Sequence, residues 1–363
     1  MISNRQKIVI LGPEGTDIRL LVSFLVLNLF SWVTLYSISG TFTLSLENPL
    51  TRQIAFSFIG VVVFFSISFF SLESIESLTP ILFIVSIVLL IIVLFTEPAF
   101  GVRRWFRFGL FDFQPSELAK LTNILMVSYI LSNKNLANYY ALIPPILSVF
   151  LIYQQPDLGT VIIILLSFFI LMYISGISTS SILVSLFSGI CTLFILIEYK
   201  LLKTWQIQRI TDFFSRPGGG DFSQEQSRLA ISSGGFLGRS EQHISDYGDI
   251  FVPVKTTDFI FSSFAENFGF LGILLLSFVW IQIFYKGMKI LGKIDEPYSR
   301  FLLIGLMGLL IVQIFINLGT VVGTLPVTGL PFPLLSLGGS AMLINAIVFG
   351  ILNRIFIENR VYI

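Results

Sequence analysis

Long apolar runs are the feature that most constrains what this chain can fold into. A helix needs about 20 apolar residues to cross the hydrocarbon core of a bilayer, and such runs recur along the whole 363-residue sequence. A mean hydropathy of +0.89 agrees with many membrane passages. We therefore predict an all-α integral membrane protein with about ten transmembrane helices. The predicted spans are 18–38, 53–70, 78–98, 116–132, 141–157, 159–177, 181–202, 259–285, 301–322 and 334–354.

The charged and sulfur-containing residues exclude several classes of function. Only 12% of the residues are charged and the net charge is +1, so nothing in the sequence indicates nucleic-acid binding. Cys191 is the only cysteine and His243 the only histidine. An intramolecular disulfide, the usual zinc spacings and a Ser-His-Asp triad are therefore excluded. Any acid–base chemistry falls to carboxylates.

The basic residues predict how the chain is oriented. An even number of spans puts both termini on one side, and Lys286, Lys289 and Lys293 crowd a short loop on that side. The positive-inside rule assigns it to the cytoplasm. One long extracytoplasmic loop, 203–258, then lies between the seventh and eighth spans of a single membrane domain, 1–363.

Four polar segments fall on the predicted outer face, as one site would require. Arginines kept there against the positive-inside bias are expected to bind something anionic. The last of the four, rich in proline and glycine, predicts a broken or re-entrant backbone. The four segments are Gly101–Trp105, Gln155–Thr160, the loop 203–258 and Gly323–Pro333.

Two carboxylates flank the start of the eighth predicted span. Asp258 either caps that helix, since aspartate accepts backbone N–H bonds at helix starts, or acts as a base at the membrane surface. The two interpretations are compatible. Glu266 lies two helical turns further on and is expected to sit deeper in a polar network with a partner.

Several other polar residues have both a structural and a functional interpretation. Glu117 and Lys120 have the spacing of an intrahelical ion pair, although either could face a substrate cavity. Arg104 and Trp105 fit an ordinary membrane interface, yet the neighbouring arginines favour phosphate binding.

Two short polar motifs remain to be interpreted. Asp157, in the motif that begins at Gln155, predicts a cap for the sixth span or a catalytic group. Ser336 and Ser340 follow the proline- and glycine-rich segment and are expected to make local hydrogen bonds.

Taken together, these motifs resemble the SEDS family of shape, elongation, division and sporulation proteins. The likeness runs in order from the first span to the last. It depends on Gly101-x-x-Arg104-Trp105, Gln114-Pro-Ser-Glu117-x-x-Lys120, Gln155-Pro-Asp-Leu-Gly-Thr160, Asp258-Phe-Ile-Phe261 with Glu266, and Pro326-x-x-Gly329-x-Pro331-x-Pro333 with Ser336-x-Gly338-Gly-Ser340.

The resemblance implies a peptidoglycan glycosyltransferase of the bacterial cytoplasmic membrane. Such an enzyme polymerises lipid II and works with a class B penicillin-binding protein in an elongation or division complex. The resemblance makes Asp258 the catalytic residue. It also implies substrate-binding roles for Arg104, Trp105, Glu117, Lys120, Arg209, Gln226, Ser227, Ser336 and Ser340.

The chain departs from the family pattern at three positions. Thr256 stands where relatives usually have histidine, Leu337 replaces a tyrosine, and Asn267 replaces a glutamate. The first departure argues against a histidine-assisted mechanism. The short tails and the wording of the motifs favour the elongation (RodA) type over the division (FtsW) type.

The residues support an inverting displacement with Asp258 as the single general base. A divalent cation, Mg²⁺ or Mn²⁺, is compatible with the diphosphate, although no carboxylate cluster demands one. Two alternatives stay open: a flippase for the lipid-linked precursor, and a non-catalytic activator of the penicillin-binding protein. A flippase should place ionisable groups near the bilayer midplane and on both faces.

Overall fold

The computed structural model describes residues 16–40, 42–98, 101–109, 111–136, 138–174, 176, 221–239 and 251–359. Within them a short 3₁₀ helix, η1 (Asn138–Leu142), precedes α5. Strands β1 (Phe106–Arg107) and β2 (Asp112–Phe113) form an antiparallel pair. The helices are α1 (Ile18–Ser39), α2 (Pro49–Phe69), α3 (Leu72–Val93), α4 (Pro115–Ser132), α5 (Ile143–Gln154), α6 (Leu158–Ile174), α9 (Phe222–Ser233), α11 (Ile260–Leu291), α12 (Pro297–Val321) and α13 (Gly339–Glu358).

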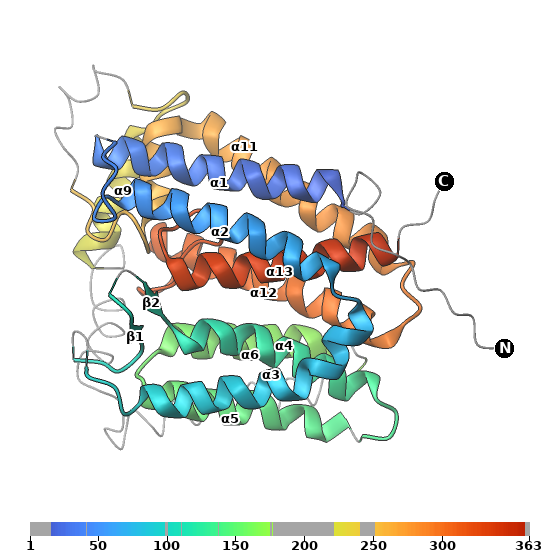
Figure 1. Ribbon diagram of the computed structural model, residues 1–363. Helices are drawn as coiled ribbons and strands as arrows, with labels where there is room; N and C mark the ends of the chain where they lie inside the picture. The colour runs from blue at the N-terminus through green and yellow to red at the C-terminus, as the bar shows by residue number, and fades with distance from the viewer. Residues whose placement is uncertain are drawn as a thin grey trace.

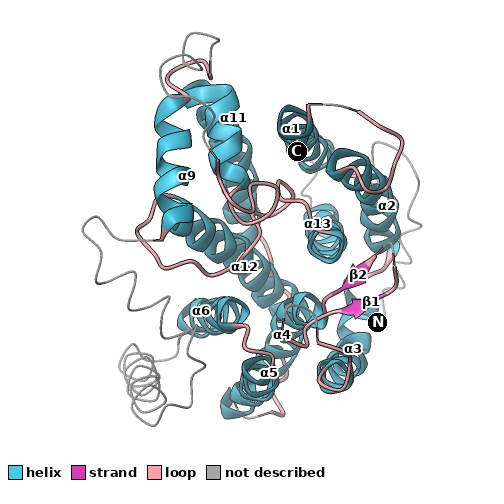
Figure 2. Cartoon of the chain, turned by 90° about the vertical axis from the view of Figure 1, so that its left-hand side faces the viewer, coloured by secondary structure: helices cyan, strands magenta, loops and turns pink. Residues whose placement is uncertain are grey.

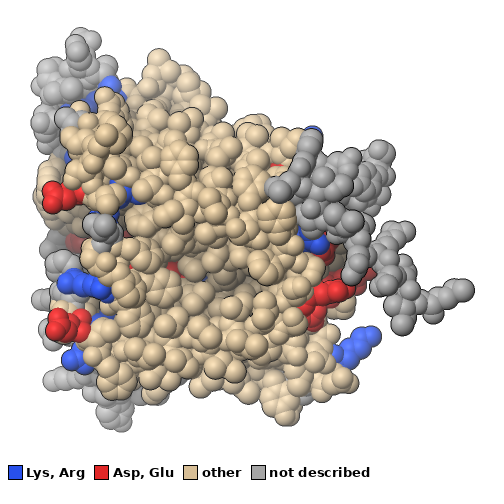
Figure 3. All heavy atoms as spheres, viewed as in Figure 1, with Lys and Arg blue, Asp and Glu red and all other residues tan. Residues whose placement is uncertain are grey.

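Six helices in the described ranges are long and apolar enough to cross a membrane: α1, α2, α3, α11, α12 and α13. Helices α5 and α6 are apolar but shorter. Lysine, arginine, aspartate and glutamate gather towards the two ends of the molecule in Figure 3, with a broad band of other residues between them. A bilayer requires such a band. The predicted helical membrane class is confirmed, while the predicted span 181–202 lies outside the described residues.

The helices form one bundle whose axes run mostly in the same direction (Figure 1). Seen along that direction in Figure 2, α13 and α4 lie inside the bundle. Helix α13 packs chiefly on α2, and α4 packs on α3, α12 and α6. Helix α1 begins at the end of the bundle where α13 finishes, whereas α9 and the two strands lie at the opposite end. We call this opposite end the site end.

An aromatic cluster fills the core between α1, α2, α11 and α13. The Phe24 ring lies 5.4 Å from that of Phe64 and 5.5 Å from that of Phe349. Trp280 packs edge-on against Phe349 at 6.2 Å. It makes a similar contact with Phe332, which follows α12 in irregular backbone. The cluster therefore ties that irregular segment to the membrane-spanning helices.

Residues 323–338, here called the proline-glycine segment, separate α12 from α13. The prediction of a broken backbone is confirmed, because this segment contains no helix or strand. Gly323 and Gly329 have φ values of +79° and +71°, a region that favours glycine. Helix α13 consequently starts at Gly339 rather than at the predicted residue 334. Leu330 and Phe332 are buried, so protein covers this irregular backbone as required at membrane depth.

Helix α9 is a short helix in the part of the chain predicted as the long loop 203–258. A capping box between Asp221 and Gln224 starts it. The chain after α9 is joined to a kink in α11 at Gly269, whose φ of 60° interrupts the helix. At this kink the Phe270 amide donates to the Gly235 carbonyl at 2.9 Å. Backbone bonds thus satisfy groups that the kink releases from α11.

Candidate functional site

Asp258 lies in a short irregular stretch that other segments hold through its backbone. The Ser336 hydroxyl donates to the Thr257 carbonyl at 2.6 Å. The Leu337 amide donates to the Thr256 carbonyl at 2.9 Å. From α12, Asn317 Nδ2 donates to the Asp258 carbonyl at 2.9 Å. Three successive backbone carbonyls, those of residues 256–258, are therefore held by neighbouring segments.

The Asp258 side chain points towards the proline-glycine segment. A Cβ added to Gly329 would lie 3.8 Å from Asp258 Oδ2. Asp258 is half-buried, as a group that meets solvent or a ligand should be. The prediction that it caps the following helix is wrong. Helix α11 starts at Ile260, and its N-cap residue, Phe259, makes no side-chain cap hydrogen bond.

Asp157 differs because its carboxylate is the centre of a hydrogen-bond cluster. Its Oδ2 accepts from Gln114 Nε2 at 3.2 Å, from the Ser116 hydroxyl at 3.3 Å and from the Thr160 hydroxyl at 3.0 Å. The Thr160 amide donates to Oδ1 at 3.3 Å. The side chain is buried, and the predicted cap of the sixth span, α6, is confirmed. Asp157 thereby joins the start of α4 to the start of α6.

Arg104 reaches the same turn from the loop after α3. Its Nε donates to the Gln155 carbonyl at 2.7 Å, and its Nη2 donates to the Pro156 carbonyl. The buried Gln155 side chain donates to the Leu90 carbonyl of α3 at 3.3 Å. Trp105 is half-buried beside it in the chain. Gln155 thus joins this turn to α3, and Arg104 lies at the site end.

Close backbone contacts join these segments into one site. A Cβ on Gly159 would fall 2.6 Å from the Thr328 carbonyl, so the turn before α6 lies against the proline-glycine segment. On the other side, the Ser340 hydroxyl donates to the Asp112 carbonyl at 2.8 Å and accepts from the Gln114 amide at 3.0 Å. Within the described ranges, the predicted convergence of the polar segments is confirmed.

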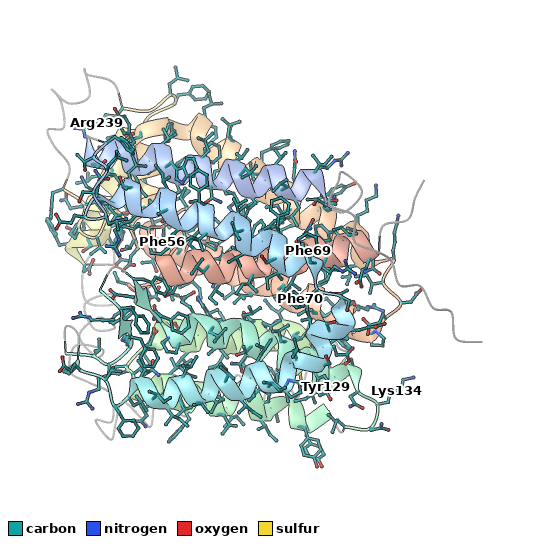
Figure 4. All side chains as sticks on the ribbon, viewed as in Figure 1. Phe56, Phe69, Phe70, Tyr129, Lys134 and Arg239 are labelled. Atoms are coloured by element: carbon teal, nitrogen blue, oxygen red, sulfur yellow. The ribbon has the colours of Figure 1, made fainter. Side chains whose placement is uncertain are left out.

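Two ion pairs lie near these segments, one buried and one partly buried. Lys120 Nζ is 2.7 Å from Glu117 Oε1 inside α4, and both side chains are almost completely buried. The predicted intrahelical pair is confirmed. The expected partner of Glu266 is Arg239, whose Nη1 lies 2.6 Å from Glu266 Oε1. Arg239 follows α9 and lies at the site end in Figure 4. Each charge is compensated, as burial requires.

The residues implied on the long loop are only partly described. Arg209 lies outside the described residues. Gln226 is half-buried on α9, whereas Ser227 is buried and donates to the Val321 carbonyl at 2.8 Å. Gln224 Nε2 donates to the carbonyls of Thr320 and Leu325. In this structure Ser227 and Gln224 anchor α9 on the end of α12.

Asn317 is the residue of this site that the sequence analysis missed. It is buried, and its Nδ2 bonds both the Asp258 carbonyl and the Leu330 carbonyl, the latter at 2.7 Å. An amide inside a largely apolar span was the available signal, because polar groups at membrane depth are rarely without function.

The fold and the site define a multi-pass membrane protein with a polar site at one end of its bundle. The family model of the FtsW, RodA and SpoVE cell cycle proteins matches residues 18–361. The chain therefore belongs to this family, the SEDS family that its motifs resemble.

Relatives and solved structures agree with this membership. Peptidoglycan glycosyltransferase MrdB of Escherichia coli K12 is 33% identical over 355 residues, covering 95% of this chain and 94% of its own. Stage V sporulation protein E of Bacillus subtilis is 30% identical over 318 residues, covering 83% and 85%. The rod shape determining protein RodA of Thermus thermophilus superposes with a TM-score of 0.70 at 26% identity, covering 95% and 97%. A chain of a peptidoglycan synthase complex superposes with a TM-score of 0.78, also at 26% identity, covering 95% and 98%.

Proposed function

We propose that this chain is a peptidoglycan glycosyltransferase that polymerises lipid II at the outer face of the bacterial cytoplasmic membrane. The observation that carries the proposal is Asp258, a half-buried carboxylate in a stretch whose backbone is fixed from α12 and from the proline-glycine segment. Relatives named as peptidoglycan glycosyltransferases support the same activity.

Asp258 supplies the general base. Its carboxylate takes the proton from the 4-hydroxyl of an acceptor sugar as that oxygen bonds to the anomeric carbon of the donor. The bond from that carbon to the diphosphate oxygen breaks, and the diphosphate leaves with the electron pair. One displacement inverts the α-linked donor to a β-linked product. General-base catalysis of this kind contributes typically about 10²–10⁴-fold.

The remaining residues of the site bind and orient the lipid-linked substrates. Arg104 lies at the site end, where a guanidinium can bind an anionic diphosphate in a bidentate manner. The resemblance adds Trp105, Arg209 and Gln226 to the proposed set. Ser227, Ser336 and Ser340 donate to backbone carbonyls in this structure, so we assign them to positioning the segments that surround the substrate.

The Glu117–Lys120 pair is proposed as part of the substrate cavity wall rather than as a direct ligand. Both side chains are almost completely buried and compensate each other at 2.7 Å. A diphosphate near α4 would meet a pair with no net charge instead of the positive charge of an isolated lysine. The pair therefore shapes the site without adding net charge.

A divalent cation, Mg²⁺ or Mn²⁺, is a compatible addition. Within the described ranges, no group of three histidine, cysteine, aspartate or glutamate side chains could hold a metal ion. An ion at this site would take most of its ligands from the diphosphate and water, as Mg²⁺ commonly does. It would offset the charge of the leaving group, and no step above depends on it.

The proposed setting follows from the topology and from the relatives. The site end is the outer face, both termini are cytoplasmic, and about ten spans cross the membrane. A class B penicillin-binding protein is the proposed partner, supported by the likeness to a chain of a peptidoglycan synthase complex. The elongation complex is favoured over the division complex, since the first-named relative is of the RodA type.

The first experiment compares polymerisation with transport. The purified chain and its partner penicillin-binding protein, with the transpeptidase serine removed, are given labelled lipid II in liposomes. We expect glycan ladders from the wild type, none from Asp258→Ala, and wild-type ladders from Asp112→Ala. Asp112 is a suitable control because it is an exposed carboxylate at the same end.

Two results would overturn the proposal. Glycan ladders from the Asp258→Ala variant would show that Asp258 is not the general base. Lipid II appearing across the liposome membrane, with no ladder from any preparation, would make the chain a flippase. A stimulated transpeptidase without any glycan synthesis would instead indicate a non-catalytic activator.

A further inference from the structure

A cavity of about 540 Å³ opens at the end of the bundle opposite the site end, between α1, α11 and α13. This is the end that the positive-inside rule assigns to the cytoplasm. The cavity is lined by four cationic side chains and by one carboxylate, that of Asp17. The cations are Arg19, Lys286, Lys289 and Lys293.

One of the four cations is already compensated. Lys286 forms an ion pair with Asp17, and its ammonium lies 5.5 Å from the centre of the Phe356 ring. The others, Arg19, Lys289 and Lys293, are exposed and make no side-chain hydrogen bond or ion pair with any described residue. The cavity therefore carries an excess of positive charge that its own wall does not neutralise.

An apolar surface runs from this cavity towards the middle of the bundle. On α1, Ile18, Val22 and Leu25 are exposed at helical spacing, so they share one face. On α11, which packs on α1, Ile281 and Phe278 are more than half exposed. In a bilayer these faces contact acyl chains. A ligand with an anionic head and hydrocarbon tails would match both parts of this surface.

We propose that this cavity binds the phosphate headgroup of an anionic phospholipid from the adjoining leaflet. Basic pockets between transmembrane helices on the cytoplasmic side commonly take such headgroups. Arg19 holds the phosphate from α1, and Lys289 and Lys293 hold it from the end of α11. The acyl chains lie along the exposed faces of α1 and α11. The ligand thereby joins two helices that begin or end at this cavity.

Binding is measured by native mass spectrometry on the full chain after titration with phosphatidylglycerol, phosphatidylcholine or inorganic phosphate. The test variant is Arg19→Gln/Lys289→Gln. The matched control, Lys134→Gln/Arg300→Gln, removes the same charge from exposed side chains at the same end but outside the cavity lining. Figure 4 shows Lys134 at that end.

We expect the wild type and the control to retain phosphatidylglycerol in preference to phosphatidylcholine. The test variant should bind phosphatidylglycerol roughly 10- to 30-fold more weakly, because it loses two of the three cations that hold the phosphate inside the cavity. Equal losses in the two double variants would reduce the effect to diffuse surface charge and overturn the proposal. Equal retention of the two lipids would overturn it too. Displacement by inorganic phosphate at the concentration of the lipid would show a free-anion site instead.

Discussion

Asp157 and Asp258 stand in two similar places and are held in opposite ways. Each lies in a polar turn just before a helix at the site end of the bundle. The Asp157 carboxylate is buried and accepts from three other side chains and one backbone amide. Around Asp258, bonds from Leu337, Asn317 and Ser336 hold the backbone carbonyls of residues 256–258.

This difference in how the two carboxylates are held distinguishes a structural residue, Asp157, from the proposed general base, Asp258. A buried carboxylate that accepts from four donors stabilises the segments that supply those donors. The stretch that carries Asp258 is held through its backbone carbonyls by α12 and the proline-glycine segment. Neighbouring segments therefore position the backbone that carries Asp258, whereas the Asp157 carboxylate positions the segments that bond to it.

The largest expected effect comes from making the same substitution in both turns. Asp258→Asn should lower the rate of glycan polymerisation by about 10²–10⁴-fold, because the general base is lost. The thermal unfolding midpoint should stay close to that of the wild type. Asp157→Asn should leave most of the rate per folded molecule. Equal rate losses in both variants would end the distinction between the two carboxylates.

Stability should show the opposite ranking. Asp157→Ala removes the acceptor of the Gln114 amide and of the buried Ser116 and Thr160 hydroxyls, and should reduce the free energy of unfolding by about 3 kcal/mol. Thermal unfolding in detergent, followed by tryptophan fluorescence, measures it. Asp112→Ala, at an exposed position on the same end, is the control. A loss no larger than in that control would contradict the proposed role of Asp157.

The Asn317→Leu variant tests whether the backbone bonds around Asp258 position its carboxylate. It removes bonds to the Asp258 and Leu330 carbonyls and should cost about 2 kcal/mol. Because the reacting carboxylate is then misplaced, the rate should fall further than stability alone explains, by up to about 10²-fold. The control is Asn345→Leu, which loses only a bond within α13. Equal rate losses in the two variants would show that Asn317 does not position Asp258.

The smallest expected effect is that of Ser336→Ala. The variant loses the bond to the Thr257 carbonyl, one of three that fix this stretch, and should be destabilised by about 1 kcal/mol. The unfolding midpoint and the polymerisation rate are measured together. Ser37→Ala, an exposed serine bonded only within α1, provides the baseline. A change indistinguishable from that baseline would mean that the other two bonds suffice.

The sequence predicted the helical membrane class and the meeting of the polar segments, because apolar run length and parity constrain both. It misplaced the role of Asp258 at the helix start. The backbone turns at Val254, whose carbonyl accepts from the amides of Thr257 and Phe259, and α11 starts later than the motif suggests. The bonds of Asn317 join residues far apart in the chain, which no local pattern reveals. Arg209 lies outside the described residues, so its predicted role stays a prediction.

The spacing of Glu117 and Lys120 also affects how this chain can be assembled. Helix α4 packs on α12, which starts only at Pro297 and leaves the ribosome roughly tens of seconds later. A lone buried charge would be exposed to lipid during that delay. Because its partner lies one turn away in the same helix, the pair is complete as soon as α4 forms. Helix α4 thus carries its own counter-ion before α12 is available to pack against it.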